Sequence, residues 1–429
     1  MKWYYLFIAF CISFQINSQA HTGPWGVYSW ASWSTKQVTK ESCPLIKGAP
    51  IILHWNKLEP EKGKYQFQKQ LGNKLKQLVE NDFNTFLMIW VGPSSPKWIY
   101  ENGVPELEME ETINPLGKKR TWTFPYYLSE AYQIHFDNLI SNFGVYLQSL
   151  PKEQLERILF IQAAEGSTGD GQPYKGNPID KKYYISKEEW EDFRIKTWET
   201  YQTAVTFKGK QQIPLLVNFD SKNGKTKEWL LDKHDAIGLK NGMFSHGYHI
   251  SEGKKRLSEW NEFKKNITDE GTRFFSRGEQ DGEWAVYGWS VQNPKQAFYW
   301  SALYATHNGL SMWNVPWKAC LGYEYQDAIV FFNRYANQHN PLTATEAFCA
   351  LRKGLDAADV TTYPEAEFGK AKRTNMDRYK KVADAYAAYG ATQGDPSKAI
   401  KGGMFNRKRD DYNDPCWLGY FGFKLRTFY

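Results

Sequence analysis

The sequence lacks several short motifs that mark common enzyme classes. It has no Walker-type glycine loop, because the glycine-rich stretch at 166–171 is not followed by Lys-Ser or Lys-Thr. It also has no Gly-x-Ser-x-Gly nucleophile elbow and no Cys-x-x-Cys pair. These absences argue against a P-loop nucleotide hydrolase, a serine hydrolase of the α/β type and a dithiol oxidoreductase.

Cysteine is also scarce, with five residues in 429. Cys11 falls in the apolar run at the N-terminus. The other four, Cys43, Cys320, Cys349 and Cys416, allow three disulfide pairings and show no metal-ligand spacing. Disulfides can therefore be no more than supporting links in a chain of this length, and buried free thiols are an equal alternative.

Only one long apolar run stands out, and it is too short to span a bilayer. Lys2 supplies a positive charge, residues 3–14 are apolar, and Ser18 and Ala20 place small residues at the −3 and −1 positions of a cleavage site. Bulky Phe10, directly before Cys11, argues against a lipoprotein. We expect residues 1–20 to be a signal peptide, the mature chain to have no membrane span, and the protein to be secreted or periplasmic.

The net charge is +7, but lysines and acidic residues are interspersed rather than gathered in blocks. This distribution argues against nucleic-acid binding. Aromatic residues make up 17% of the chain and include 18 tryptophans. Clefts rich in Trp suit carbohydrate, because the indole offers an apolar plate to the C–H faces of a sugar ring. An aromatic-rich core would give the same composition.

Short apolar runs alternate with helical patterns, which indicates βα units around a parallel sheet. Several runs are continuously apolar, as expected for strands covered on both faces. Eight such units predict a (β/α)₈ TIM barrel. The expected strands are 26–33, 49–55, 85–91, 157–163, 213–219, 242–246, 272–276 and 309–313.

Amphipathic spacing predicts helices over 128–147 and 190–204, and further helices over 295–307 and 326–337. The barrel should therefore occupy residues 21–340. Residues 341–429 predict a mainly helical C-terminal extension that ends in an aromatic run. Such an ending is compatible both with a tail packed on the barrel and with a missing continuation.

Working residues of such a barrel sit where strands end and βα loops begin. Glu165 directly follows the fourth expected strand, and Glu279 follows the seventh in the same manner. Hydrolysis of a glycosidic bond needs a protonated carboxyl at the leaving oxygen and a second carboxylate at the anomeric carbon. We expect Glu165 and Glu279 to form this pair, although Asp281 and Glu283 stand close enough to take the second role.

At this point the sequence resembles the clan A retaining glycoside hydrolases, whose acid/base and nucleophile end strands four and seven. The segment from His54 to Phe67 (HWNKLEPEKGKYQF) is similar to one after their second strand. The loop from Pro93 to Tyr100 looks like the third-strand loop of family 42-like β-galactosidases and agarases. The resemblance covers roughly residues 26–317 and is specific to the clan rather than to one family.

The resemblance implies that Glu165 is the acid/base, Glu279 the nucleophile, and that hydrolysis proceeds with retention. The clan usually carries Asn before the acid/base, to bind the sugar 2-hydroxyl, whereas this chain has Ala164. Another residue must make that contact, or Glu165 is not the acid/base, or the family is divergent. The implied substrates are β-linked, galactose-containing poly- or oligosaccharides, algal ones among them.

The other polar and aromatic residues at the strand ends are candidates for binding substrate. Core packing is an equal alternative for the tryptophans, and loop shaping is an alternative for Asp170. The substrate-binding candidates are His54, Asn56, Trp98, Asp170, Asn218, His246, Tyr248, Trp313 and Trp317.

Two other hypotheses of function compete with that of a glycosidase. Asp220, His246 and His249 could ligate a metal, but zinc needs a suitable geometry that the spacing alone does not supply; we expect no metal and no cofactor. A non-catalytic carbohydrate-binding barrel is the alternative from another class, and Ala164 favours it. In either case the expected partner is a polysaccharide or oligosaccharide, and the sequence does not indicate an oligomeric state.

Overall fold

The computed structural model describes residues 23–30, 39–113, 119–219, 224–232, 234–241, 253–279, 302, 305–306, 309–321 and 325–337. The expected signal peptide and the expected extension at 341–429 lie outside these ranges, as does most of the helix expected over 295–307. Asp220, His246, Tyr248 and His249 lie outside them too.

The centre of the molecule is one sheet of eight strands, and every pair of neighbours in it is parallel. The order in space is β1-β14-β13-β12-β11-β8-β3-β2, which follows the order of the strands along the chain around a ring. The strands are β1 (Gly26–Ser29), β2 (Ile51–His54), β3 (Thr85–Trp90), β8 (Ile158–Gln162), β11 (Leu215–Phe219), β12 (Ala236–Asn241), β13 (Arg273–Glu279) and β14 (Met312–Val315).

The ring closes between β1 and the residues that lead into β2. Gly48 forms parallel bridges with Tyr28 on one side and with Asn84 on the other. The Ser29 amide donates to the Gly48 carbonyl at 3.0 Å, and the Lys47 amide donates to the Val27 carbonyl at 2.9 Å. With helices between successive strands from β2 to β13, this closed parallel sheet is the predicted (β/α)₈ barrel.

Seven of the eight expected strands overlap an observed strand, and the sixth strand of the barrel begins earlier in the chain than expected, while residues 242–246 themselves lie outside the described residues. The chain forms β12 at Ala236–Asn241, before the expected 242–246. Two of its residues that face the barrel interior are Gly238 and Lys240, so the strand has no continuous apolar run. Gly238 is required there because a Cβ would collide with the Phe275 ring.

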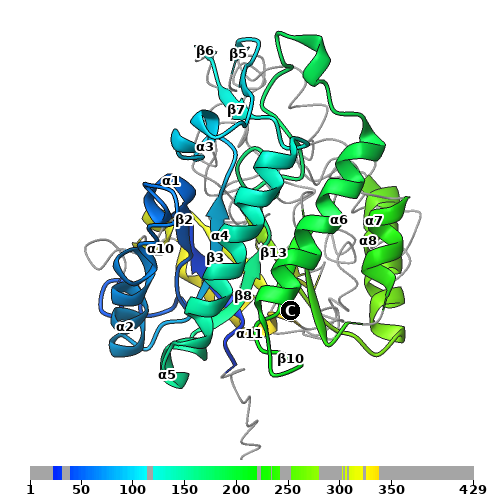
Figure 1. The fold of residues 1–429 in the computed structure, drawn as a ribbon. Coiled ribbons are helices and arrows are strands. Elements are labelled where there is room, and N and C mark those ends of the chain that lie inside the picture. Colours follow the sequence, from blue (N-terminus) through cyan, green and yellow to red (C-terminus); the bar gives the residue numbers. More distant parts are fainter. Residues whose placement is uncertain are drawn as a thin grey trace, which may run out of the picture.

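Helices pack around the outside of the ring, as Figure 1 shows for α4 and α6 in front of the strands. Ser129 caps α4 by accepting from the Tyr132 amide, and Ser186 forms a capping box with Glu189 at the start of α6. The described α-helices are α1 (Trp55–Leu58), α2 (Asn73–Glu80), α3 (Trp98–Glu101), α4 (Glu130–Gln148), α5 (Lys152–Leu155), α6 (Lys187–Ala204), α7 (Lys225–Leu231), α8 (Gly253–Asp269), α10 (Trp317–Leu321) and α11 (Gln326–Tyr335).

Alternate residues of each strand belong to two separate apolar clusters. The larger cluster fills the space between the strands and the helices, and it includes Val27, Leu87 and Ile161. The smaller cluster fills the inside of the ring and consists of Tyr28, Phe86, Phe160, Leu216, Phe275 and Met312. The period of two along each strand therefore assigns every strand residue to the interior or to the helix layer.

Short hairpins cap one end of the barrel. The pairs β4 (Glu106–Glu108) with β7 (Thr123–Pro125), and β5 (Thr112–Ile113) with β6 (Lys119–Arg120), lie at the top of Figure 1, beyond α3. The hairpin of β9 (Thr206–Phe207) and β10 (Lys210–Gln211) lies at the opposite end.

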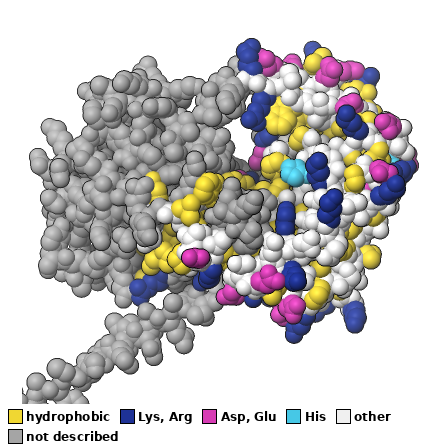
Figure 2. All heavy atoms as spheres, turned by 90° about the vertical axis from the view of Figure 1, so that its left-hand side faces the viewer, with side chains coloured by type: hydrophobic (Ala, Val, Ile, Leu, Met, Phe, Trp, Pro, Cys, Tyr) yellow, Lys and Arg dark blue, Asp and Glu magenta, His cyan; other side chains and the backbone are white. Residues whose placement is uncertain are grey.

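Basic and acidic side chains are interspersed over the coloured part of the face drawn in Figure 2, as the sequence predicts. Among the helices that the structure describes, none combines the length and the apolar character that crossing a bilayer requires.

Replacement of Gly48 by Ala should weaken the barrel where it closes. The new Cβ would collide with the Asn84 carbonyl oxygen and press on the Tyr28 ring. We expect Gly48→Ala to lower the free energy of unfolding by about 1–3 kcal/mol, measured by urea denaturation. Gly23→Ala is the matched control, because nothing lies within 4 Å of its Cβ; equal effects of the two changes would contradict the proposed closure.

Candidate active site

The carboxyl ends of the eight strands meet at one mouth of the barrel. The strand alternation assigns one polar or aromatic residue near the end of each strand to the interior side. These residues are Trp30, His54, Trp90, Gln162, Asn218, Lys240, Glu279 and Asn314. The mouth is therefore a polar layer with two indoles, above the aromatic layer inside the ring.

Glu279, the expected nucleophile, ends β13 and is only 6% exposed. Lys240 Nζ lies 2.7 Å from Glu279 Oε1, and Arg277 NH2 lies 2.7 Å from Oε2. Burial alone would raise the pKa of this carboxyl, but the two cations outweigh burial and lower it. Glu279 is thus held as a carboxylate at neutral pH.

Arg277 is fully buried beneath Glu279, and its position is fixed on several sides. Its Nε donates to Asn314 Oδ1 at 2.6 Å, and its NH1 donates to Gln162 Oε1 at 2.7 Å. The guanidinium also lies over the Trp30 ring, 4.4 Å from the centroid. Side chains from β1, β8 and β14 therefore orient the arginine that orients Glu279.

Asp170 lies in the loop after β8, next to this cluster. Lys240 Nζ is 3.5 Å from Asp170 Oδ1, and the Lys175 ammonium bonds the other oxygen. Burial works to raise the pKa of Asp170, yet Lys240 and Lys175 hold it well below its usual range. Asp170 and Glu279 are thus both anionic and share Lys240.

Glu165, the expected acid/base, lies at the rim between β8, β11 and α6, and none of its surface is exposed. Its Oε1 accepts from Trp198 Nε1 at 2.5 Å and from Arg194 Nε at 3.4 Å. Its Oε2 lies 3.5 Å from the Asn218 amide nitrogen. The contacts that fix Glu165 therefore lead to α6 and β11, whereas those that fix Glu279 lead to β12 and β13.

His54, another expected substrate contact, ends β2 at the mouth. Its Nδ1 lies 2.9 Å from Ser94 Oγ, and its ring meets the Trp90 ring edge-on at 5.3 Å. Burial, followed by the charges of Lys74 and Lys57, lowers the pKa of His54, so the imidazole is neutral at pH 7. The neighbouring residue Asn56 is the second residue of α1 and is half-buried, and its backbone N–H donates to the Ser94 carbonyl at 2.8 Å.

Trp98 and Trp313 do not lie at the mouth, which corrects the expectation that they stack on sugar. The Trp98 indole is buried against Trp55 and donates from Nε1 to the Glu59 carbonyl at 3.0 Å. Trp313 is fully buried on the helix side of β14, against Phe332. Both belong to the outer core. Trp317 is half-buried at the start of α10 and packs against the same core.

The indoles that do lie at the mouth are Trp30 and Trp90. The Trp90 Nε1 atom is buried and has no hydrogen-bond partner within the described part of the chain. A buried indole N–H without a partner at the mouth of a barrel is a candidate donor to a ligand hydroxyl. Sequence reasoning missed Trp90, Lys240 and Arg277. Trp90 and Arg277 follow the interior residues Phe86 and Phe275 at the even spacing of one strand face, which was the signal that could have found them, whereas Lys240 follows Gly238 and had no such signal.

No group of three or more potential metal ligands occurs among the residues that the structure describes. The expected sugar contacts His246 and Tyr248, and the metal alternative with Asp220 and His249, fall on residues outside that part. Cys43 and Cys320 are free, buried thiols, and burial raises the pKa of both.

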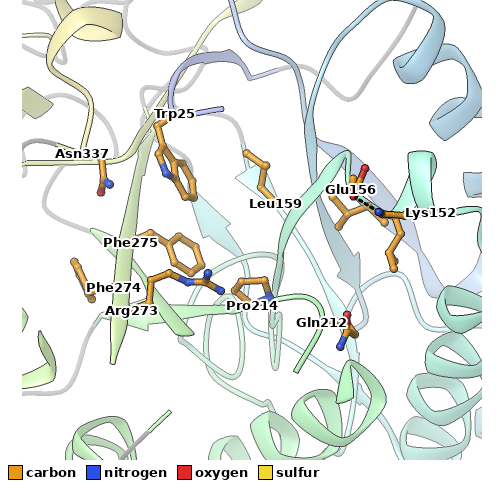
Figure 3. A pocket seen from close by; sticks show the side chains of 12 residues that line it. Trp25, Lys152, Glu156, Leu159, Gln212, Pro214, Arg273, Phe274, Phe275 and Asn337 are labelled. Atoms are coloured by element: carbon orange, nitrogen blue, oxygen red, sulfur yellow. Dashed lines mark ion pairs between the residues drawn. The ribbon is translucent and has the colours of Figure 1, made fainter. Parts of the chain in front are cut away.

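A hollow of about 450 Å³ opens at the other end of the barrel, where the strands begin (Figure 3). Trp25 and Phe275 stack in it at 5.5 Å, and Pro214 and Arg273 lie beside them. This hollow is remote from the strand ends that carry Glu165 and Glu279, so it is distinct from the candidate active site.

Comparisons with known proteins give neighbours in structure only. No protein-family model and no curated protein match the chain. A cold-adapted β-galactosidase from Rahnella sp. R3 is similar at 11% identity and a TM-score of 0.48, over 86% of this chain and 64% of that enzyme. An intracellular xylanase from Thermoanaerobacterium saccharolyticum JW/SL-YS485 is similar at 9% identity and a TM-score of 0.39, over 70% of this chain and 87% of the xylanase.

A family 39 glycoside hydrolase from Bacteroides cellulosilyticus WH2 is similar at 12% identity and a TM-score of 0.40, covering 68% of this chain and 56% of that one. All three are glycoside hydrolases, and this chain spans just under two thirds of the length of the galactosidase. With so few identical residues, the side chains at the mouth are the guide to function.

Asp170→Asn should make the stability of the protein depend less on pH in the acid range. A carboxyl with a depressed pKa stabilises the fold above its unfolded pKa of about 3.9 and loses this contribution as the pH falls through the folded pKa. We expect the variant to be less stable than the wild type at pH 7, and the difference to shrink below about pH 4. Urea midpoints at pH 7 and pH 3 measure it.

The control for this experiment is Asp192→Asn, which removes an exposed partner of Lys225. An exposed ion pair contributes little, so this variant should follow the wild type at both pH values. A constant difference between wild type and Asp170→Asn across the pH range would contradict the ionised state of Asp170.

Proposed function

We propose that the protein is an exported, retaining glycoside hydrolase that cleaves β-linked, galactose-containing poly- or oligosaccharides at the carboxyl end of its barrel. One observation carries the proposal. A buried carboxylate, Glu279, ends the seventh strand of the barrel and is kept ionised by Lys240 and Arg277, beside two indoles at the mouth.

An ionised and oriented carboxylate is what a nucleophile in glycoside hydrolysis requires. Arg277 and Lys240 hold both oxygens of Glu279, so the carboxylate has a defined orientation toward the mouth. Attack on the anomeric carbon would form a glycosyl-enzyme ester and break the bond to the leaving oxygen. Trp30 and Trp90 offer apolar faces and, at Trp90, an N–H donor to the sugar.

Glu165 is proposed as the acid/base. Its Oε1 is anchored by Trp198, so Oε2 is the oxygen that would carry the proton to the leaving group and later take one from water. The clan's usual Asn before the acid/base is Ala164 here, but Asn218 of β11 brings an amide next to Glu165 Oε2. This amide supports the assignment, because it supplies from the next strand the group that Ala164 lacks.

The proposed export of the protein and the proposed galactoside substrate rest on the sequence. The apolar run at residues 3–14 with small residues at 18 and 20 supports export. The resemblance of the loop from Pro93 to Tyr100 to those of β-galactosidases and agarases supports a galactoside. A panel of algal and plant polysaccharides, with the anomeric configuration of the first product followed by NMR, tests the sugar and the retention of configuration together.

Glu279→Gln should nearly abolish turnover, with a loss on the order of 10³-fold or more, because the amide cannot form the glycosyl ester. The fold should persist, since Gln keeps the shape of the side chain. Turnover of the best substrate from the panel measures the effect, and circular dichroism checks the fold. Near-normal activity would refute the catalytic role of Glu279.

Glu165→Gln should show a loss that depends on the leaving group. Without a proton donor, we expect turnover of the polysaccharide to fall by about 10²–10⁴-fold. A 4-nitrophenyl glycoside should lose less, because nitrophenolate leaves without protonation. Trp198→Phe is the comparison variant, since it removes the indole donor to Glu165 and keeps the carboxyl. An equal loss on both substrates, or loss in Asp170→Asn instead, would reject Glu165 as the acid.

A non-catalytic carbohydrate-binding barrel is the second candidate. The observation that favours it is the full burial of Glu165 among the donors Arg194, Trp198 and Asn218, which suits an acceptor of hydrogen bonds rather than a proton donor. Titration calorimetry with the same panel separates the two functions, because the binding protein retains oligosaccharide and releases no reducing ends.

A further inference from the structure

Lys240 occupies an unusual position at the mouth of the barrel. It lies on the interior side of β12, is 5% exposed, and contacts three acceptors, as many as an ammonium group has N–H donors. These are Glu279 Oε1 at 2.7 Å, the Gly169 carbonyl at 3.3 Å and Asp170 Oδ1 at 3.5 Å. One buried side chain thus joins the seventh strand to the loop that follows the fourth.

Arg277, the other cation that contacts Glu279, bonds to a different set of residues. It stands two residues before Glu279 on the same strand, and its remaining bonds go to Gln162 and Asn314 inside the barrel. Arg277 therefore orients Glu279 from below. Among the described residues, only Lys240 contacts both Glu279 and the loop that carries Asp170.

We infer that Lys240 is a positioning residue of the reaction, whose charge keeps Glu279 in the carboxylate form and holds the loop at Asp170 against it. The inference rests on the proposed function for its consequence in catalysis. Among the described residues, the charged groups that face Glu279 are Lys240 from β12, Arg277 from β13 and Asp170 from the loop after β8, with Lys175 behind Asp170. Of these, loss of Lys240 would leave Glu279 with the cation of Arg277 and the opposing charge of Asp170.

The contacts of Lys240 determine the direction in which its loss should change the pKa of Glu279. A nearby cation lowers the pKa of a carboxyl by about 1–3 units. Without Lys240, Glu279 should take up its proton at a higher pH. The acid limb of the kcat/KM profile should then move upward, because a protonated nucleophile does not attack.

The experiment titrates Glu279 directly. Protein labelled with ¹³C at the glutamate carboxyls is followed by NMR against pH, and the Glu279 resonance is assigned by its absence in Glu279→Gln. In Lys240→Met this resonance should titrate about 1–3 pH units higher than in the wild type, and the acid limb measured with 4-nitrophenyl β-galactoside should move by the same amount. Lys240→Arg keeps the charge and should restore most of the original titration.

Lys225→Met is the matched control, because it removes a lysine that bonds a carboxylate at 2.5 Å on the surface, at Asp192. It should leave the titration of Glu279 and the pH profile unchanged. If Lys240→Met does not fold, Lys240→Gln carries the same expectation, since the amide retains N–H donors without the charge.

An unmoved Glu279 titration in the folded variant, or an equal shift in Lys240→Arg, overturns the inference. Normal turnover in Glu279→Gln would instead remove the glycosidase proposal, so the two failures are distinguishable.

Discussion

The structure depends on the compensation of charges that are buried at the mouth of a closed barrel. Removing an ion from water costs several kcal/mol unless a partner and further hydrogen bonds offset the loss. Each of these buried charges has a partner of opposite sign: Glu279 lies between Lys240 and Arg277, and Lys240 also contacts Asp170. The arrangement holds only while β12 and β13 stay in register and the loop after β8 stays against them, because its members come from these three segments.

The layers inside the ring explain why this charge cluster is rigid. Aromatic and aliphatic side chains fill the lower interior, and Arg277 lies directly above them, its guanidinium 4.6 Å from the centre of the Phe86 ring. Neutral amides at Gln162 and Asn314 take its other N–H groups. Each of the three guanidinium nitrogens thus donates a hydrogen bond, and the apolar layer packs against the group from below. An oriented anion at Glu279 is the consequence.

The sequence predicts most of the barrel because most of its strands are continuous apolar runs. It misplaces the sixth strand because Gly238 and Lys240 interrupt the run, and both residues are explained by their neighbours on the adjacent strand β13, Phe275 and Glu279. It places Glu279 at the correct strand end. It could not separate Trp98 from Trp90 as an indole at the mouth, because Trp98 packs into the core from α3, whereas the register of β3 directs Trp90 to the interior.

The surroundings of Glu165 and Glu279 differ, and the difference supports the separate roles that we propose for them. Glu279 has two cations at 2.7 Å, one on each oxygen. Beside Glu165, Arg194 Nε lies 3.4 Å from the oxygen that also accepts from a neutral indole, and a neutral amide lies beside the other oxygen. Coulomb attraction falls with distance, so the two cations at 2.7 Å are what hold Glu279 as an anion. In the proposed mechanism Glu165 carries the proton, and two carboxylates in unlike surroundings act as acid and nucleophile at one pH.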